Sequence, residues 1–210
     1  MSKSVYLRAF CDEDAVEINK WRNNPNVMSL TCGRFRHVGL EMEKAWVHSK
    51  IMNNATEEYF AICLADGSDK IIGYQCIRNI DTVNRTAHAA GIVISPEYQD
   101  GTYMLDASLL LLEYAFIHIG LNRLTGSCLK QHTDSRTMME MLGFSLEGIE
   151  RESLYKNHCY MDVCRYSILY KDYTDILRDN GYTLTAIAKR AATIRKQLIN
   201  IKHHGNQAIY

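Results

Sequence analysis

The stretch GIVISPEYQDGTYMLDASLLLLEYAF, which runs from Gly91 to Phe116, decides the fold of this chain. Its β-branched run, Ile92 to Ile94, is followed by Pro96, a short polar loop and then apolar residues at helical spacing. This pattern predicts a strand, a loop and a helix in direct succession. The start of the helix would direct unpaired backbone N–H groups and the positive end of the helix dipole at one point. Such a point suits an anionic ligand, typically a phosphate.

Length and composition narrow the class of protein. At 210 residues the chain is long enough to bury a core, and we expect one domain over residues 1–173 and a basic helical extension over residues 174–210. Its 24 basic and 24 acidic residues balance, so no net charge recruits nucleic acid or a membrane surface. The apolar run Leu109 to Ile119 is too short to span a bilayer. We therefore expect neither a membrane nor a nucleic-acid partner.

Seven cysteines occur without a CxxC pair. An odd number, together with the lack of a signal-peptide pattern, favours free thiols in a reducing cytoplasm over a disulfide framework. Cys159 and Cys164 follow His158, but the spacing of metal-ligand pairs is absent, so no metal site is expected.

The predicted elements follow a regular order along the chain. Strands are expected at residues 5–10, 59–64, 71–80, 87–94 and 123–129, with a final hairpin of residues 144–155 and 160–170. Helices are expected at residues 12–23, 40–52, 103–119 and 135–141, the first ended by Asn24-Pro25 and the last by Gly143. The order β, αα, βββ, α, β, α, ββ predicts an α/β (α+β) fold, a mixed sheet with helices on both faces.

Residues 181–210 differ in character from the rest of the chain. They carry five lysines and arginines and no acidic residue. Ile187, Ala191, Ile194 and Leu198 fall at helical spacing. The segment is either a docked amphipathic helix with a solvated basic face or a surface for an acidic partner.

Several short motifs occur in this order: WRNNPNV (21–27), IIGY (71–74), SPEYQ (95–99), LGF (142–144), EG (147–148) and YKNHCYMDV (155–163). Together they resemble the GNAT superfamily of acetyl-CoA-dependent N-acyltransferases over about residues 5–173. The resemblance is greatest to two branches, which acetylate N-terminal alanines of ribosomal proteins and nucleotide-linked amino sugars. It implies a GNAT-like, mostly antiparallel central sheet, acetyl-CoA as acyl donor without a metal, and, as the family expectation, a homodimer.

The resemblance also implies an activity, the transfer of an acetyl group to the primary amine of a small acceptor by direct attack on the thioester. A nucleotide-linked amino sugar is favoured over a protein N-terminus, because the final hairpin is similar to that of the sugar branch. The neutral charge agrees, since a polycationic ribosomal target would favour an acidic acceptor face. N-terminal protein acetylation is one alternative, and a non-catalytic binding module of this fold is another.

The family's pyrophosphate loop reads Gln or Arg, two residues, Gly, one residue, then Gly or Ala. The aligned residues here are Gln99, Asp100, Gly101, Thr102, Tyr103 and Met104, so Thr102 and Met104 stand where small residues are usual. Glycine serves there because the backbone approaches the pyrophosphate closely, and Asp100 competes with phosphate for the same N–H groups. Either the N–H groups of residues 102–104 still bind the pyrophosphate, with the Thr102 hydroxyl as an added donor, or the coenzyme A site is weakened.

The resemblance assigns further residues to the coenzyme and the chemistry. The backbone of Ile92, Val93 and Ile94 pairs with the pantetheine arm, and Gly91 supplies the kink that splays this strand from its neighbour. Met139 stands where many relatives have a tyrosine that acts as the general acid. The ribosomal branch uses the serine of an Asn-x-x-Ser motif near the coenzyme sulfur, and His132 and Ser135 stand at its two ends here. Ser135 is therefore the candidate acid, unless it only caps the helix that it begins.

His88 is the candidate base, because its ordinary pKa suits proton transfer near neutrality. It shares a face with Ala90 and Ile92 if the strand is regular. The alternative is a hydrogen-bonded histidine of the surface or core.

The acceptor pocket is expected at the end of the first helix, as in the superfamily. The candidates are Trp21, Arg22, Asn23, Tyr74 and Tyr155. Arg22 could clamp a carboxylate or phosphate of the acceptor. Trp21 could instead pack in the core, and Arg22 and Asn23 could satisfy carbonyls at the helix end.

Overall fold

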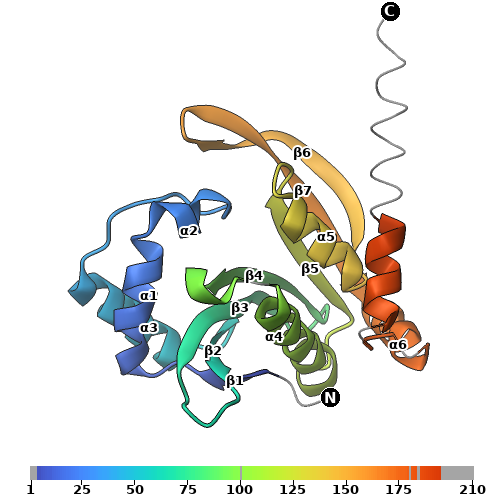
Figure 1. Cartoon of the computed structure of the whole chain (residues 1–210), viewed down its shortest axis with the longest axis horizontal. Coiled ribbons are helices and arrows are strands. Elements are labelled where there is room, and N and C mark those ends of the chain that lie inside the picture. The colour runs from blue at the N-terminus through green and yellow to red at the C-terminus, as the bar shows by residue number, and fades with distance from the viewer. Residues whose placement is uncertain (1–3, 100, 180, 184, 195–210) are drawn as a thin grey trace, which may run out of the picture.

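The computed structural model describes residues 4–99, 101–179, 181–183 and 185–194, which form a seven-stranded sheet with helices on both faces (Figure 1). The strands are β1 (Val5–Ala9), β2 (Glu57–Leu64), β3 (Ile71–Asp81), β4 (Thr86–Ile94), β5 (Arg123–Leu129), β6 (Ser145–Lys156) and β7 (Cys159–Leu169). Their order across the sheet is β1-β2-β3-β4-β5-β7-β6. All neighbouring strands are antiparallel except β4 and β5, which are parallel. The predicted mixed, mostly antiparallel sheet is confirmed.

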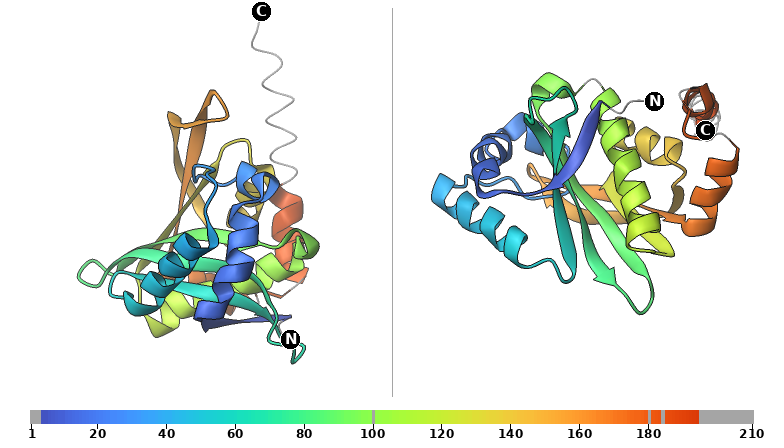
Figure 2. Two further views of the ribbon diagram at one scale, coloured as in Figure 1. Left: turned by 90° about the vertical axis from the view of Figure 1, so that its left-hand side faces the viewer. Right: turned by 90° about the horizontal axis from the view of Figure 1, so that it is seen from below.

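Two groups of helices cover the two faces of the sheet (Figure 2). One face, here the α1 face, is covered by η1 (Asp12–Asp14), α1 (Ala15–Arg22) and α3 (Leu40–Met52), with α2 (Pro25–Ser29) beyond α1. The other, the α4 face, is covered by α4 (Thr102–Glu113) with its π-helical continuation η3 (Tyr114–His118), and by α5 (Thr133–Met141) and α6 (Tyr170–Arg178). A short turn, η2 (Pro96–Tyr98), lies between β4 and α4.

Each face has its own apolar core, as strand alternation requires. On the α1 face, Ile18 and Val47 pack with Ala61, Tyr74 and Val93. On the α4 face two clusters form. They combine strand residues that point to this side, Ile62, Ile77, Leu124 and Tyr166, with Ala107 and Leu112 of α4.

The strand β4 contains a β-bulge at Gly91. Tyr74 pairs with Val93, but Cys76 pairs with Ala90, so β4 has one extra residue between the two pairs. Gly91 has φ +64°, a left-handed conformation that a residue without Cβ adopts at little cost. The strand is therefore not regular: His88 shares the α1 face with Ala90 and Val93, whereas Ile92 packs with Ile94 on the α4 face. His88 and Ile92 were expected on one face only if the strand was regular, and because of the bulge they lie on opposite faces.

The strands β4 and β5 pair only at their beginnings. Thr86 to Ala89 lie opposite Arg123 to Gly126, and the register between them stops there although both strands continue. Beyond this point β5 pairs with β7 alone and β4 with β3 alone. The predicted splay next to Gly91 is confirmed.

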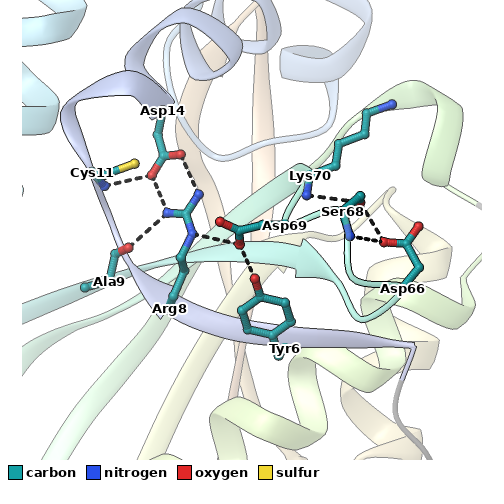
Figure 3. Close-up of polar contacts among 9 residues, drawn as sticks. All are labelled: Tyr6, Arg8, Ala9, Cys11, Asp14, Asp66, Ser68, Asp69 and Lys70. Carbon is teal, nitrogen blue, oxygen red and sulfur yellow. Dashed lines mark hydrogen bonds and ion pairs between the residues drawn. The ribbon is translucent and has the colours of Figure 1, made fainter.

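A network of polar side chains joins β1 to the start of the first helix (Figure 3). Arg8 donates from Nη1 and Nη2 to the two carboxylate oxygens of Asp14 at 2.8 and 2.9 Å, and Asp14 also accepts from the N–H of Cys11 at 2.9 Å. On the outer side, Arg8 forms an ion pair with Asp69 at 3.5 Å, and the Tyr6 hydroxyl donates to the same carboxylate. The network fixes the direction in which η1 and α1 leave the sheet.

Two helices were not predicted from the sequence. Asn24-Pro25 does end α1, but it also starts α2, because the Asn24 side chain accepts from the N–H of Asn26 and proline occupies the first helical position. The last strand ends at Leu169, and α6 begins at Tyr170, inside the stretch predicted as strand. The helix α6 spans the expected domain boundary at residue 173.

The C-terminal extension packs on the domain in the described residues. Residues 185–194 are helical, and Ile187 and Ile194 are buried. The Tyr182 hydroxyl donates to Leu142 O at 2.9 Å, and Arg190 donates through Nε to Met141 O at 2.9 Å, at the C-terminal end of α5. This is the docked amphipathic helix of the first alternative; Leu198 lies outside the described residues.

Candidate active site

The loop between β4 and α4 ends in a residue that has no side chain to cap the helix. Gly101 is the N-cap of α4 and has φ +90°, and a Cβ built on it would meet no atom within 4 Å. Gly101 therefore offers no side-chain acceptor to the first backbone N–H groups of α4. This arrangement fits the pyrophosphate of coenzyme A.

The departures from the family loop are less disruptive than the sequence implied. The helix begins at Thr102, and the left-handed φ falls on Gly101, which the chain retains. Met104 packs in a core cluster, as does Tyr103, whose ring also makes an edge contact with Tyr98 at 5.4 Å between centroids. Gln99 donates to Ile94 O at 2.8 Å and so closes the loop onto the end of β4. Asp100 lies outside the described residues.

The last part of β4, which has no strand on its second side, comes directly before this loop in the chain. Ile92, Val93 and Ile94 are bonded to β3 on one side only, and β5 has already diverged on the other. A strand edge with free backbone groups is what an extended pantetheine arm needs as a partner.

Ser135 lies on α5 beside the diverging part of β5. The helix begins at Thr133, and the residue that caps it is His132, whose Nδ1 accepts from the N–H of Ser135 at 3.4 Å. Ser135 is thus inside the first turn and close to Cys128 on β5, whose thiol pKa is raised chiefly by burial, with the Ser135 side chain acting in the opposite direction. The expectation that Ser135 might only cap the helix is wrong. Burial lowers the pKa of His132, which keeps the ring neutral and able to accept.

Met139, in the position of the tyrosine of many relatives, lies directly over β5. A Cβ on Gly126 would come within 2.6 Å of its terminal methyl group. A thioether cannot donate a proton, so Ser135, one turn earlier on α5, stays the candidate acid.

His88 lies on the α1 face, hydrogen-bonded to two hydroxyl residues of β5. Its Nδ1 is 3.0 Å from Thr125 Oγ1, and its Nε2 is 3.5 Å from Ser127 Oγ. The Thr125 hydroxyl donates its proton to Ala87 O at 3.0 Å, so it can only accept from His88. This assigns the proton of the neutral ring to Nδ1 and leaves the lone pair on Nε2.

The surroundings of His88 keep it neutral. Burial, followed by the charges of Arg78 and Arg165, lowers the pKa of His88 below its ordinary 6.5. In a neutral imidazole the Nε2 lone pair, which here faces Ser127 Oγ at 3.5 Å, can accept a proton at pH 7.

His88 opens into a depression of about 460 Å³ on the α1 face. Its lining is basic and rich in hydroxyl groups, and consists of Arg78, Asn79, Thr86, Ala87, His88, Arg123, Thr125, Ser127 and Arg165. Two of the arginines form paired contacts with glutamates of β6, Arg123 with Glu147 and Arg165 with Glu150. Apart from His88, the residues that line the depression were not predicted from the sequence. Arg123, Thr125 and Ser127 nevertheless show the alternation that places polar residues on one face of a strand.

The aromatic candidates of the acceptor pocket are part of the core. Trp21 is buried and stacks on Tyr74 at 6.5 Å between ring centroids, and Trp46 completes the group. Tyr74 lies next to the bulge, since its ring carbon is 3.9 Å from the position of a Cβ on Gly91. Burial raises the pKa of Tyr74, so its phenol is a hydrogen-bond donor and not a base.

The polar candidates of α1 already have partners. Arg22 donates to Glu43 at 2.6 Å, and its guanidinium lies 4.4 Å from the centre of the Trp46 ring. Glu43 is fully buried, and its second oxygen has no hydrogen-bond partner among the described residues. Asn23 bonds both backbone groups of Val38. Arg22 and Asn23 are therefore engaged within the fold, and Asn23 also donates to the helix carbonyl of Asn19 at 3.0 Å, as the second alternative for these residues has it.

Tyr155 lies apart from these residues, at the end of the β6–β7 hairpin. It is exposed, and its ring is 5.0 Å from that of Tyr160. The structure thus brings Ser135, His88 and the β4 edge together around the splay, with Trp21 and Tyr74 behind it.

Comparison with known proteins decides the family. The acetyltransferase (GNAT) domain matches residues 4–145. The chain belongs to the GNAT family of acetyltransferases. YnaD, an N-acetyltransferase of Bacillus subtilis, is 27% identical over 173 residues, which are 82% of this chain and 97% of YnaD. YdaF, a candidate ribosomal N-acetyltransferase of the same organism, is 34% identical over 110 residues, 52% of this chain and 58% of YdaF.

A solved structure gives the same fold with coenzyme present. Spermidine N-acetyltransferase from Vibrio cholerae, in complex with CoA and spermine, matches with a TM-score of 0.74 and 25% identity over 81% of this chain and 98% of the other. This GNAT chain is therefore an acyltransferase enzyme that uses acetyl-CoA as donor. The interpretation as a binding module without turnover is not retained.

Metal-ligand clusters and membrane-spanning helices are absent from the described residues. These residues contain no group of three or more His, Cys, Asp or Glu side chains arranged to hold a metal ion. No helix in them is both long and apolar enough to cross a membrane. All seven cysteines are free thiols.

Proposed function

We propose that this GNAT enzyme acetylates the primary amine of a small acceptor that also carries an anionic group, as a nucleotide-linked amino sugar does. The observation that carries the proposal is the charge of the depression around His88. Three guanidinium groups line it, and no carboxylate does among the described residues. Arg78 is exposed there, and no ion pair is seen for it in the described part of the chain.

The same charge argues against a polyamine acceptor. The structure from Vibrio cholerae contains spermine, a polycation that an acidic surface would attract. Here the groups nearest to the candidate base are arginines and hydroxyls, and Glu147 and Glu150 are already paired with two of them. Arginine and hydroxyl side chains are instead the usual partners of phosphate.

The chemistry assigns one proton transfer to each candidate residue. An ordinary alkyl ammonium must lose a proton before attack, which costs about 4–5 kcal/mol at pH 7. Nε2 of His88 would take this proton from the acceptor side. The Ser135 hydroxyl would give a proton to the leaving thiolate from the α4 face and regain one through solvent, which would also take the second proton that the acetylated nitrogen loses. Backbone groups of β4 would hold the thioester extended along the splay.

The test is a thiol-release assay with purified enzyme, acetyl-CoA and four acceptors. These are a uridine-diphosphate-linked amino sugar, the same amino sugar without the nucleotide, spermidine, and a peptide with an N-terminal alanine. We expect the nucleotide-linked sugar to have the highest kcat/KM. Its KM should be at least about tenfold below that of the free sugar, which corresponds to about 1.4 kcal/mol from the anionic group.

Arg78→Gln tests whether Arg78 is the residue that recognises the anionic group of the acceptor. The variant should raise KM for the nucleotide-linked sugar and leave KM for the free sugar unchanged. Faster turnover of spermidine than of either sugar would overturn the proposal in favour of a polyamine, and preference for the peptide would establish N-terminal acetylation instead.

A further inference from the structure

Lys156, at the end of β6, is buried although it is a lysine in a hairpin that is otherwise exposed. Its relative exposure is 7%. Its ammonium donates to three backbone carbonyl oxygens, Met28 at 2.6 Å, Thr31 at 2.7 Å and Gly33 at 3.1 Å. An ammonium group has three donors, so all of them are used. Lysine is almost never buried without such compensation.

The three carbonyls belong to one short stretch, residues 28–33, here the α2 segment. It contains the last residues of α2 and the turn that follows, more than 120 positions before Lys156 in the chain. The Met28 carbonyl belongs to the last turn of α2 and also accepts from the Thr31 hydroxyl at 2.9 Å, whereas the Thr31 and Gly33 carbonyls belong to the turn after the helix. A buried cation that satisfies them fixes both the hairpin and the α2 segment.

The α2 segment also reaches the diverging end of β5. Cys32 lies between two of the carbonyls that Lys156 binds, and burial raises the pKa of its thiol while Lys156, Arg165 and the nearby backbone of Leu129, the last residue of β5, lower it. The charge of Arg165, which lines the depression around His88, also acts on this thiol. The α2 segment thus contacts the end of the β6–β7 hairpin, below which it lies in Figure 1, and its Cys32 is close to the end of β5.

We propose that Lys156 is a positioning residue for the acceptor: its ammonium holds the α2 segment against the β6–β7 hairpin and so fixes the wall of the acceptor pocket above β5. The inference rests on the proposed function for the place of the acceptor. Lys156 has no part in proton transfer, because its three donors are engaged with carbonyls.

The position distinguishes two parts of the catalytic cycle. Acetyl-CoA would contact the β4–α4 loop and the β4 edge, and neither of these touches Lys156 through a hydrogen bond among the described residues. A loosened α2 segment should therefore weaken acceptor binding and leave donor binding intact.

The experiment compares Lys156→Met, Lys156→Arg and the control Lys44→Met. Lys44 is an exposed lysine of α3 that forms a surface ion pair with Glu41. For Lys156→Met we expect the KM for acceptor to rise at least tenfold, with kcat within about threefold of the wild type. The dissociation constant of acetyl-CoA, measured by calorimetry, should stay the same. The KM of Lys156→Arg for acceptor should fall between those of the wild type and Lys156→Met. The control Lys44→Met should match the wild type in KM, in kcat and in the dissociation constant of acetyl-CoA.

Hydrogen exchange of the same proteins gives a readout that needs no acceptor. The backbone amides of residues 28–37 should exchange at least tenfold faster in Lys156→Met, and those of α3 should not change. If Lys156→Met does not fold, Lys156→Arg carries both measurements, because a planar guanidinium cannot present its donors to the same three carbonyls. Unchanged exchange in this stretch, or faster exchange with an unchanged KM, would overturn the inference.

The two proposals fail in different ways. If the wild-type enzyme does not acetylate the nucleotide-linked sugar, the proposed acceptor is wrong, and the KM comparison is made with whichever amine the wild type uses. If the acceptor is right but Lys156→Met behaves as the control does, only the positioning role is wrong.

Discussion

His88 and Ser135 approach the diverging part of β5 from opposite faces of the sheet. His88 meets Ser127 on the α1 face, and Ser135 meets Cys128, the next residue, on the α4 face. Acetyl transfer handles its two protons at different atoms, the attacking nitrogen and the leaving sulfur. A base and an acid on opposite sides of one splayed strand pair suit this division, because neither needs to bond to the other.

The pH dependence of activity should report His88. Its pKa lies below the ordinary 6.5, so the ring is unprotonated at pH 7 and loses its function as pH falls through that pKa. We expect the acidic limb of kcat/KM to have its midpoint below pH 6.5. His88→Gln should lower kcat/KM about 100-fold and remove this limb.

Arg78→Gln provides the control for this assignment. Removing a cation that disfavours the imidazolium raises the pKa of His88, so the acidic limb should move to higher pH. A limb that stays in place in Arg78→Gln, or that persists in His88→Gln, would belong to another group.

Ser135→Ala should separate chemistry from helix capping. His132 caps α5, so the loss of the Ser135 hydroxyl should leave the melting temperature unchanged while kcat falls about tenfold or more. His132→Ala should show the opposite pattern in stability, with a loss of about 1 kcal/mol from the missing cap. Steady-state kinetics and thermal unfolding of both variants decide the matter. Equal kcat in the wild type and Ser135→Ala would remove Ser135 from the mechanism.

At the scale of elements, the hydrophobic pattern located most of the fold. The helix Leu40–Met52 and the strand Arg123–Leu129 have the predicted bounds, because both carry strong periodicity between clear end signals. The misses have local causes. A five-residue helix such as α2 has too few positions for a period, and the apolar residues Ile168, Leu169 and Tyr170 read as a continuing strand.

The site was less accessible to sequence than the fold. The loop and the Ser135 position follow from local motifs, whereas the facing of Ile92 relative to His88 depends on the bulge at Gly91, which moves every later side chain of β4 to the other face. Glu43 and Lys156 could not be assigned at all. Their roles depend on partners 21 and more than 120 positions away, which only the folded chain brings together.

The Arg8–Asp14 pair should be an element-scale determinant of stability. Asp14 is 3% exposed, it accepts two hydrogen bonds from Arg8 and one from the backbone of Cys11, and it joins β1 to the start of α1. Because Arg8 is partly exposed, solvent reduces the penalty of an unpaired buried charge, and Asp14→Asn should cost about 2 kcal/mol. Urea unfolding measures it.

Glu17→Gln is the matched control for this change. Glu17 pairs with Lys20 three residues along the same helix, and both side chains are well exposed. Exposed pairs contribute little, so the change in unfolding free energy should stay within about 0.5 kcal/mol. Equal effects of the two substitutions would mean that the Arg8–Asp14 pair does not anchor the helix.

At the scale of the whole molecule, the acetyltransferase domain and the C-terminal extension have different relations to the site. The domain provides the splay, the loop and both candidate catalytic residues. The extension packs behind α5, where Tyr182 and Arg190 bond the carbonyls of Leu142 and Met141 at the end of that helix. In its described residues the extension bonds to the helix that carries Ser135, so its first expected effect is on stability.

Deletion of residues 181–210 should therefore lower the stability of the fold. The deletion exposes the surface that Ile187 and Ile194 cover and frees two carbonyls at the end of α5. After the entropy of ordering the segment is subtracted, we expect a loss of about 2 kcal/mol, or about 4–8 °C in melting temperature for a chain of this size. Scanning calorimetry measures the loss, and Lys189→Gln, which changes an exposed charge of the same helix, should leave the melting temperature unchanged. An unchanged melting temperature on deletion would mean that the extension does not hold α5, and its basic residues would then be tested against an acidic partner.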